Sequence, residues 1–293
     1  MKVLILGASG FLGGTIYSKI KNSGNEVLGT YSKNNKNRDY IKLDVFEISS
    51  LTALVTEYKP DVIIWTVMNH EREEEIAEKV MPALCDAVGS KRFIFVSTSV
   101  AYEKNMSESV EPFLRTEESY NHHYFNGKIK SEQVISKLPN YCIVRPGSIY
   151  GIDPFGEMDN RSLALKKHVD SGEIYIRANN IEFSIVDVNE LADAIIELTT
   201  NDYVGILNVS EEKPVSHYAF NKALCRKYGW DDSCIVANEE KENIYYLDNS
   251  LRKRILKTRI GWLQDNIPVE LSRCATACQG CGAAFLFYLK SSR

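Results

Sequence analysis

Three tyrosine and lysine pairs in this chain are spaced four residues apart, a spacing that suits proton transfer by the tyrosine. They are Tyr17 with Lys21, Tyr124 with Lys128, and Tyr218 with Lys222. On a helix such residues share one face about 5–6 Å apart, so the lysine charge lowers the pKa of the phenol and makes it a usable acid or base. Lysine is also common on helix surfaces, and the chain has 16 tyrosines. The elements that carry each pair must therefore show which one does chemistry.

The composition is typical of a soluble globular protein with a sizeable core. The chain has 293 residues, of which 44% are hydrophobic and 25% are charged, enough for one large domain or two smaller ones. The net charge of −4 argues against a nucleic-acid partner, and no apolar run approaches the ~20 residues of a membrane span. The five histidines form no metal pattern. Reduced thiols in a cytoplasmic protein are expected, because four of the seven cysteines lie among apolar residues: Cys85, Cys142, Cys225 and Cys234.

Short apolar runs recur through the first half of the chain, at residues 3–7, 26–31, 40–45, 61–67, 92–97 and 141–147. Such continuous runs are typical of parallel strands that helices cover on both faces. Amphipathic stretches between them predict helices over 11–22, 48–58, 71–88 and 121–137. We interpret the acidic run EREEE (71–75) as a solvated face at a helix N-terminus. The pattern predicts an α/β fold with a Rossmann-type doubly wound parallel sheet over residues 1–147.

The regular alternation fades after residue 147. Later segments predict helices over 161–172, 188–200 and 216–229, and strands over 173–178, 181–188 and 205–210. We interpret residues 148–270 as a smaller C-terminal substrate lobe interleaved with the first domain, with the ligand in the cleft between them. Residues 271–293 form an atypical tail, to which we assign no function although it contains Cys274, Cys278 and Cys281.

A glycine motif, Gly7-x-x-Gly10-x-x-Gly13, lies directly after the first predicted strand and opens the first predicted helix. Its glycines suit a tight turn, close approach of the backbone to a pyrophosphate, and close packing of helix on sheet. This context predicts dinucleotide binding. It also makes Tyr17 and Lys21 ordinary residues of a packing helix.

The cofactor preference depends on the end of the second strand, where NAD specificity requires an acidic residue. The sequence there, Thr30-Tyr31-Ser32-Lys33, has no acid, so NADP is favoured and NAD is the alternative. A polar surface loop is the other interpretation of this segment. Asp44, after the third strand, is placed to touch an adenine ring.

Hydroxyl residues follow the fifth predicted strand, at the edge of the sheet where the cleft opens. Of Ser97, Thr98 and Ser99, Thr98 is placed to hydrogen-bond a substrate oxygen, although such residues also cap strands. The predicted helix over 121–137 returns Tyr124 to the same cleft. Tyr218 and Lys222 have no comparable context.

The order and spacing of these motifs, with FVSTSVAY (95–102) and RPGSIYG (145–151), resemble those of extended short-chain dehydrogenase/reductases over residues 1 to about 265. The chain is similar to the branch that modifies nucleotide sugars, which includes NAD-dependent epimerases and dehydratases and dTDP-4-dehydrorhamnose reductase-like proteins. The resemblance implies that Tyr124 is the catalytic acid/base, that Lys128 binds the nicotinamide ribose and lowers the tyrosine pKa, and that Thr98 orients the reacting sugar oxygen.

The resemblance also implies a wider set of contacts and a homodimer formed through a helix pair. The expected cofactor contacts are Gly7, Gly10, Phe11, Leu12, Gly13, Thr30, Ser32, Lys33, Asp44, Val45 and Lys128. The expected substrate contacts are Ser99, Arg145, Ser148 and Phe183. Two departures stand out: the family's usual Asn has no match near Glu75 and Ile76, and Ser148 replaces an Asn that contacts the substrate in many nucleotide-sugar enzymes.

We therefore interpret the chain as an NAD(P)-dependent oxidoreductase or epimerase acting on a nucleotide-linked sugar. One alternative is a reductase of a non-sugar carbonyl, and another is an NAD(P)-binding regulatory protein of the same fold without turnover. The intact Tyr124, Lys128 and Thr98 argue against the regulator, whereas the missing Asn favours it. The cofactor loop favours a reductase, which releases oxidised cofactor in each cycle, over an epimerase, which keeps its NAD.

Overall fold

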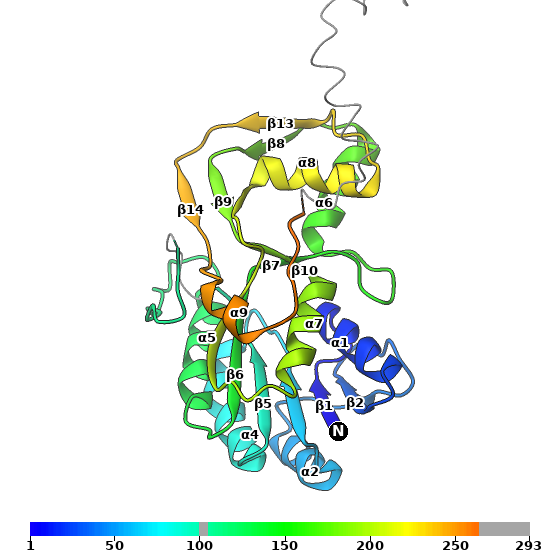
Figure 1. Ribbon diagram of the computed structural model, residues 1–293, viewed down its shortest axis with the longest axis vertical. Coiled ribbons are helices and arrows are strands. Elements are labelled where there is room, and N and C mark those ends of the chain that lie inside the picture. Colours follow the sequence, from blue (N-terminus) through cyan, green and yellow to red (C-terminus); the bar gives the residue numbers. More distant parts are fainter. Residues whose placement is uncertain (100–104, 264–293) are drawn as a thin grey trace, which may run out of the picture.

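The fold is built on a seven-stranded sheet in which all neighbouring strands are parallel. The computed structural model describes residues 1–99 and 105–263 (Figure 1). The strand order is β11-β6-β5-β4-β1-β2-β3, which reverses direction between β1 and β4, the place where doubly wound sheets bind ligands. The strands are β1 (Lys2–Leu6), β2 (Glu26–Tyr31), β3 (Ile41–Lys42), β4 (Val62–Trp65), β5 (Arg92–Val96), β6 (Tyr141–Pro146) and β11 (Gly205–Val209). The predicted Rossmann-type α/β fold is confirmed.

Helices cover both faces of this sheet, because alternate strand residues point to opposite sides. On one face, Val3 and Ile5 of β1 pack in a core with α1 (Phe11–Asn22) and α7 (Val188–Leu198). On the other face, Leu4 and Leu6 pack with α2 (Ile48–Tyr58), α4 (Met81–Val88) and the end of α5 (His122–Ile135). The sheet is therefore buried on both faces, as its continuous apolar strands predicted.

The predicted helix over 71–88 is interrupted. It consists of α3 (Glu73–Glu75), a π-helical turn η1 (Ile76–Val80) and α4. Pro82 lies in the first turn of α4, where a residue without an N–H interrupts the regular hydrogen-bond pattern. Single π-helical turns often occur at functional sites, and this one adjoins the residues that contact α5.

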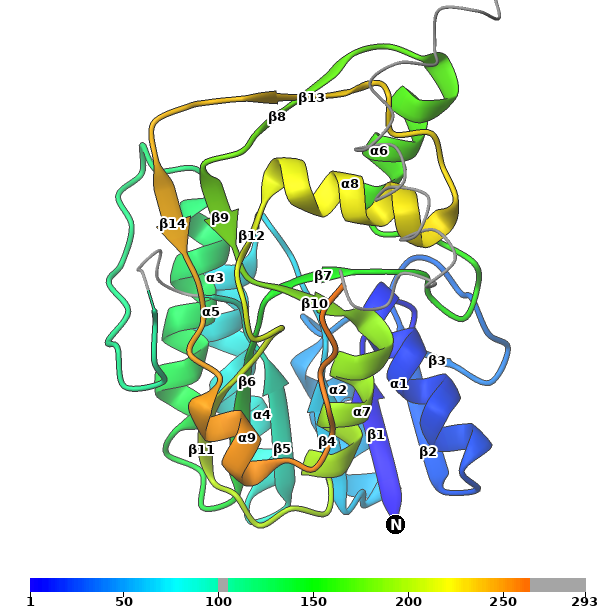
Figure 2. The same cartoon turned by 45° about the horizontal axis from the view of Figure 1, so that its top comes forward.

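A second lobe lies beyond the carboxyl ends of the sheet (Figure 2). It contains α6 (Asn160–Ser171), α8 (His217–Tyr228) and the short strands β7 (Ser148–Tyr150), β8 (Tyr175–Ala178), β9 (Ile181–Phe183), β10 (Ile185–Asp187), β12 (Val215–Ser216), β13 (Ile235–Asn238) and β14 (Asn243–Tyr245). Between these elements the chain returns to the sheet and contributes α7 and the edge strand β11, and after β14 it returns again with α9 (Ser250–Ile255). The proposed tail, 271–293, lies outside the described residues.

The cysteines that the structure describes are free and buried, in keeping with the expected reduced thiols: Cys85, Cys142, Cys225 and Cys234. Burial raises the pKa of the Cys85 thiol to about 11, which leaves it protonated and unreactive near neutral pH. Across residues 1–99 and 105–263, none of the helices combines the length and the apolar character needed to cross a bilayer.

Three carboxylates hold residues 257–263 against the rest of the fold by accepting hydrogen bonds from backbone N–H groups. They are the side chains of Glu190, Glu197 and Glu211. Glu211 is the most buried of them, at 1% exposed. It accepts hydrogen bonds from the Leu263 N–H at 3.0 Å and from the Tyr150 hydroxyl at 2.8 Å. Burial raises the pKa of Glu211 from 4.5 to about 7.

This raised pKa predicts that Glu211→Gln will reduce the loss of stability that occurs as the pH rises. The folded chain binds a proton at Glu211 that the unfolded chain has released, so between pH 4.5 and about 7 this carboxyl lowers the free energy of unfolding as pH increases, by up to ~3 kcal/mol. Glutamine does not ionise and can still bond both partners. Urea unfolding at about pH 5 and about pH 8 measures this effect. The free energy of unfolding of the variant, relative to that of the wild type, should be higher at about pH 8 than at about pH 5.

The neighbouring Glu212 provides the matched control, because it is exposed and its pKa is lowered by an ion pair with Lys253. Glu212→Gln should not relieve the loss of stability at alkaline pH. Equal pH dependence in the wild type and Glu211→Gln would contradict the raised pKa.

Candidate functional site

The glycine turn between β1 and α1 leaves the start of the helix open to an anion. Gly10 is the N-cap of α1 and has no side chain to bond the first turn, and Gly7 has a positive φ of 93°. A Cβ on Gly13 would lie 2.3 Å from the Gly7 carbonyl oxygen, so this contact between helix and turn requires glycine. The free N–H groups and the positive end of the helix dipole fit the pyrophosphate of a dinucleotide.

Two threonines hold this turn from behind. The Thr30 hydroxyl accepts the Gly7 N–H at 3.1 Å, and the Thr66 hydroxyl donates to the Gly7 carbonyl at 3.2 Å. Thr30 is only 2% exposed and its side chain supports the glycine turn, while its direct contact with the cofactor stays a prediction. Sequence reasoning missed Thr66, although a hydroxyl residue that directly follows a central strand was a usable signal.

The other expected cofactor contacts fall into two groups. Ser32, Lys33 and Asp44 are exposed beyond the ends of β2 and β3, with Asp44 also accepting the Phe46 N–H at 3.1 Å. Leu12 and Val45 have buried side chains in the two sheet cores. The half-buried Phe11, not counted in either group, begins α1. The structure thus places the polar side chains at the surface beyond β2 and β3, and the apolar ones in the cores of the sheet.

The second-lobe loop 151–159 reaches back to this region. Lys36, which follows the exposed Ser32 and Lys33, forms ion pairs with Asp153 and Glu157. The Lys36 ammonium also lies 5.3 Å from the centre of the Phe155 ring. These contacts engage the charge of Lys36 within the protein.

Tyr124 and Lys128 lie on α5 at the carboxyl ends of two central strands. The Lys128 ammonium donates to the carbonyls of Val67, after β4, and Val96, at the end of β5, at 3.1 and 3.3 Å. It lies 5.8 Å from the centre of the Tyr124 ring, which is itself 5.0 Å from the His70 ring. Tyr124 is 9% exposed and Lys128 is 1% exposed.

The other two tyrosine and lysine pairs make the packing contacts and ion pairs of ordinary helix residues. In α1, Tyr17 is buried edge-on against the Tyr40 ring, and Lys21 pairs with Asp39 on the surface. Tyr218 and Lys222 lie on α8, in the second lobe. Lys222 forms an ion pair with Asp232. These contacts agree with their assignment as ordinary helix residues.

The acidic run EREEE is not simply a solvated face, and the expectation was wrong for Glu73. This side chain is fully buried, and its Oε1 atom lies 2.9 Å from the Lys128 ammonium in an ion pair. Glu74 and Glu75 do lie on the outer side, where they pair with Lys130 and Arg72. A local run of charge does not reveal which member meets a partner 55 residues away.

Gly127, the residue before Lys128, permits this ion pair. A Cβ on Gly127 would lie 2.3 Å from the carbonyl carbon of Glu73, so α5 approaches α3 closely only because the residue is glycine. The preceding residue, Asn126, bonds both the backbone N–H and the carbonyl of Arg115. The segment between tyrosine and lysine therefore fixes α5 against α3 and the loop before it.

Arg145 has a different environment from the substrate contact that was expected. It is 1% exposed, and its guanidinium donates to both carboxylate oxygens of Glu132, at 3.1 and 2.6 Å. The Ser97 hydroxyl bonds the same carboxylate at 2.5 Å. Because Ser97 is engaged there, Thr98 and Ser99 are the half-exposed hydroxyls left at the end of β5. Sequence reasoning missed Glu132, although its position four residues after Lys128 places it on the same face of α5.

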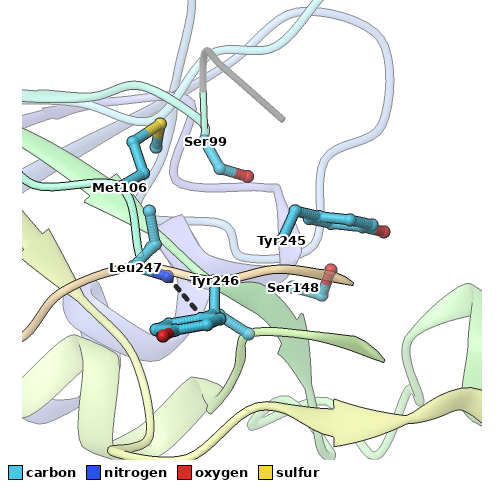
Figure 3. Close-up of a pocket in the computed structure, with 7 residues that line it drawn as sticks. Ser99, Met106, Ser148, Tyr245, Tyr246 and Leu247 are labelled. Carbon is cyan, nitrogen blue, oxygen red and sulfur yellow. Dashed lines mark hydrogen bonds between the residues drawn. The ribbon is translucent and has the colours of Figure 1, made fainter. Parts of the chain in front are cut away.

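A pocket opens between the end of β5 and the second lobe (Figure 3). Its lining includes two of the expected substrate contacts, Ser99 and Ser148. The remaining lining residues are Met106, Ser184, Tyr245, Tyr246 and Leu247. The lining therefore combines hydroxyl groups with aromatic and aliphatic side chains.

Phe183 lies behind the pocket, not in its lining. It is 1% exposed and stacks on the His217 ring at 4.5 Å, within the core of the second lobe. The next residue, Ser184, lines the pocket, and its hydroxyl accepts the Leu247 N–H at 2.9 Å. The pocket lining thus includes the residue next to Phe183, and the expected substrate contact of Phe183 stays a prediction.

Comparison with known proteins adds a family and a set of similar folds. Residues 3–210 match the model of the NAD dependent epimerase/dehydratase family. A UDP-glucose 4-epimerase of Mycolicibacterium smegmatis is 24% identical over 187 residues, which are 54% of this chain and 59% of that protein. The match therefore spans less than two thirds of the relative.

Two solved structures share the fold over 90% or more of this chain. One is a hypothetical dTDP-4-dehydrorhamnose reductase of Sulfolobus tokodaii, with a TM-score of 0.74 and 20% identity over 92% of this chain and all of the other. The second is a dTDP-4-dehydrorhamnose reductase of Bacillus anthracis in complex with NADP, with a TM-score of 0.73 and 17% identity over 90% and 96% of the two chains.

Proposed function

Since the chain belongs to the NAD-dependent epimerase/dehydratase family, we propose that it reduces or epimerises a nucleotide-linked sugar with Tyr124 as acid/base. One observation carries this proposal: two consecutive residues after β4 join the glycine turn to the tyrosine and lysine pair. The Thr66 hydroxyl bonds Gly7, and the Val67 carbonyl accepts from Lys128. The cradle for a dinucleotide and the candidate acid/base therefore adjoin the same point of the sheet, where this fold binds ligands.

The side chains of the site have distinct tasks in this reaction. When bound, the nicotinamide cofactor supplies a carbon that takes or gives a hydride. Tyr124 moves the proton of the reacting sugar oxygen, and Thr98 donates a hydrogen bond to the same oxygen. Ser99 and Ser148 bind sugar hydroxyls in the pocket that they line. The turn at Gly7, Gly10 and Gly13 holds the pyrophosphate.

For the cofactor we propose NADP, held at its 2′-phosphate by Ser32 and Lys33. Both side chains are exposed beyond β2, whereas the charge of Lys36 is engaged by Asp153 and Glu157. Lys33→Glu should weaken NADPH binding by about tenfold or more and leave NADH binding nearly unchanged, because only NADPH carries the additional phosphate. Calorimetric titration with the two dinucleotides measures this effect.

A charge reversal elsewhere is the control for this titration. Lys137→Glu, at an exposed position just after α5, should leave both affinities unchanged. Tighter binding of NADH than NADPH by the wild type would contradict the NADP assignment and favour the epimerase over the reductase.

The function itself is tested with a panel of UDP- and dTDP-linked sugars. We expect one of them to raise the melting temperature of the cofactor-loaded protein, and the same compound to turn over. A reductase oxidises one NADPH for each sugar converted, whereas an epimerase interconverts sugars without net change in cofactor. Dinucleotide binding without a stabilising nucleotide sugar would favour a non-sugar carbonyl substrate or a regulator, and failure to bind any dinucleotide would refute the proposal.

A further inference from the structure

The buried ion pair between Glu73 and Lys128 bears on the chemistry of Tyr124. Both side chains are almost completely withdrawn from solvent, with 0% of Glu73 and 2% of Lys128 exposed. An isolated buried charge is unfavourable, so the two charges stabilise each other. The other Glu73 oxygen, Oε2, accepts the Asn69 N–H at 2.8 Å, which fixes the carboxylate in place.

The Lys128 ammonium lies against three protein oxygens and against the Phe95 and Tyr124 rings. It has three N–H groups, and it meets the Glu73 carboxylate at 2.9 Å and the carbonyls of Val67 and Val96 at 3.1 and 3.3 Å. Two of its N–H groups donate to the carbonyls, and the Glu73 carboxylate balances its charge. The position of Lys128 is therefore set by the protein before any cofactor arrives.

The ion pair also changes the charge that faces the phenol. A lone lysine cation 5.8 Å from the Tyr124 ring would favour the phenolate, whereas a carboxylate 2.9 Å from that cation opposes the effect. Other titratable groups against Tyr124 include His70 from the segment after β4, whereas Glu74 and His123 pair with each other on the outer side of α3 and α5.

We propose that Glu73 is a positioning residue that holds Lys128 and makes the two side chains act on Tyr124 as a neutral pair. This rests on the proposed role of Tyr124 as acid/base. Glu73 lies two residues before the place where the expected Asn is missing, and its carboxylate holds Lys128 through the buried ion pair. The site thereby keeps Tyr124 protonated to a higher pH than a lone lysine would, which suits a group that donates a proton during reduction.

Ionisation of Tyr124 is measured in the free protein by ultraviolet difference absorbance against pH. For each variant, the same protein with the additional substitution Tyr124→Phe serves as the blank. Subtracting its absorbance removes the contribution of the other tyrosines. Glu73→Gln leaves the lysine charge uncompensated, so Tyr124 should ionise about one pH unit lower than in the wild type. The pH profile of turnover should shift in the same direction. The matched control is Glu75→Gln, which removes an acid of the same run that pairs on the surface with Arg72 and Lys79 and should not shift the titration.

A double variant keeps the test decisive if Glu73→Gln does not fold, since a buried lysine without its partner is costly. Glu73→Gln combined with Lys128→Met removes both charges, so Tyr124 should ionise close to the wild-type pH. An upward shift of one unit or more in the double variant, or no shift in Glu73→Gln, would overturn the neutral-pair proposal. The titration needs no cofactor or substrate, so its outcome is independent of whether the proposed reaction is correct.

Discussion

Tyr124→Phe is expected to lower turnover by about 10²–10⁴-fold while leaving dinucleotide affinity near the wild-type value. The substitution removes one hydroxyl, and general acid–base catalysis by a positioned side chain contributes a factor of this size. The ring is 9% exposed and packs against His70 and Phe125, contacts that phenylalanine preserves. Initial rates with saturating cofactor and nucleotide sugar, together with calorimetric titration of the cofactor, measure both quantities.

The chain supplies its own control for this experiment. Tyr218 stands in the same spacing to Lys222 on a helix, with the ammonium 5.7 Å from the ring, almost the same distance as in the proposed site. Tyr218→Phe should therefore preserve turnover, since α8 belongs to the second lobe and its lysine pairs with Asp232. If Tyr124→Phe also retained full turnover, the acid/base assignment would be refuted.

Gly13→Ala is expected to cause the second large effect, a loss of dinucleotide binding together with reduced stability. The added methyl would lie 2.3 Å from the Gly7 carbonyl oxygen and 2.6 Å from the Thr66 hydroxyl oxygen. Neither α1 nor the turn can accommodate this without moving, because Gly7 is also bonded to Thr30. We expect at least a 100-fold weaker NADPH affinity and a loss of about 1–3 kcal/mol in the free energy of unfolding.

Gly14→Ala is the matched control, because it replaces the adjacent glycine of the same helix outside the close contact with Gly7. A Cβ there would meet the Phe155 ring at 2.9 Å, and a side chain at the surface of a loop can move aside. Gly14→Ala should bind NADPH with near wild-type affinity, and alanine has the higher helix propensity. Normal NADPH binding by Gly13→Ala would contradict the role of this turn.

The parts of the fold that depend on local pattern were predictable from the sequence. The helices α1 and α2 have the predicted bounds, 11–22 and 48–58, because their apolar periodicity and flanking residues agree. The predicted strand over 181–188 is two strands instead, since Ser184 turns its hydroxyl to the Leu247 N–H between them. The elements β13, β14 and α9 have only 4, 3 and 6 residues, which is too short for a periodic sequence signal.

Within the candidate site, the sequence located segments better than it located side-chain contacts. Ser99 and Ser148 line the pocket, as residues at the carboxyl ends of strands should. Arg145 and Thr30 instead bond groups within the protein, Glu132 and Gly7, that are distant in sequence. Glu73, which was expected on a solvated face, likewise pairs with a distant residue, Lys128. Long-range pairing of polar groups depends on the assembled fold and leaves no periodic pattern to detect.

The return of the chain to the sheet after residue 147 determines which fragments can exist alone. Because β11 and α7 come from beyond that residue, a fragment 1–147 would expose the hydrogen-bonding edge of β6 and the part of one apolar face of the sheet that α7 covers. Exposed edges of this kind invite pairing with other chains. The dinucleotide-binding half is thus not an autonomous module that could be excised or transplanted, and the two lobes should be inherited, expressed and unfolded together.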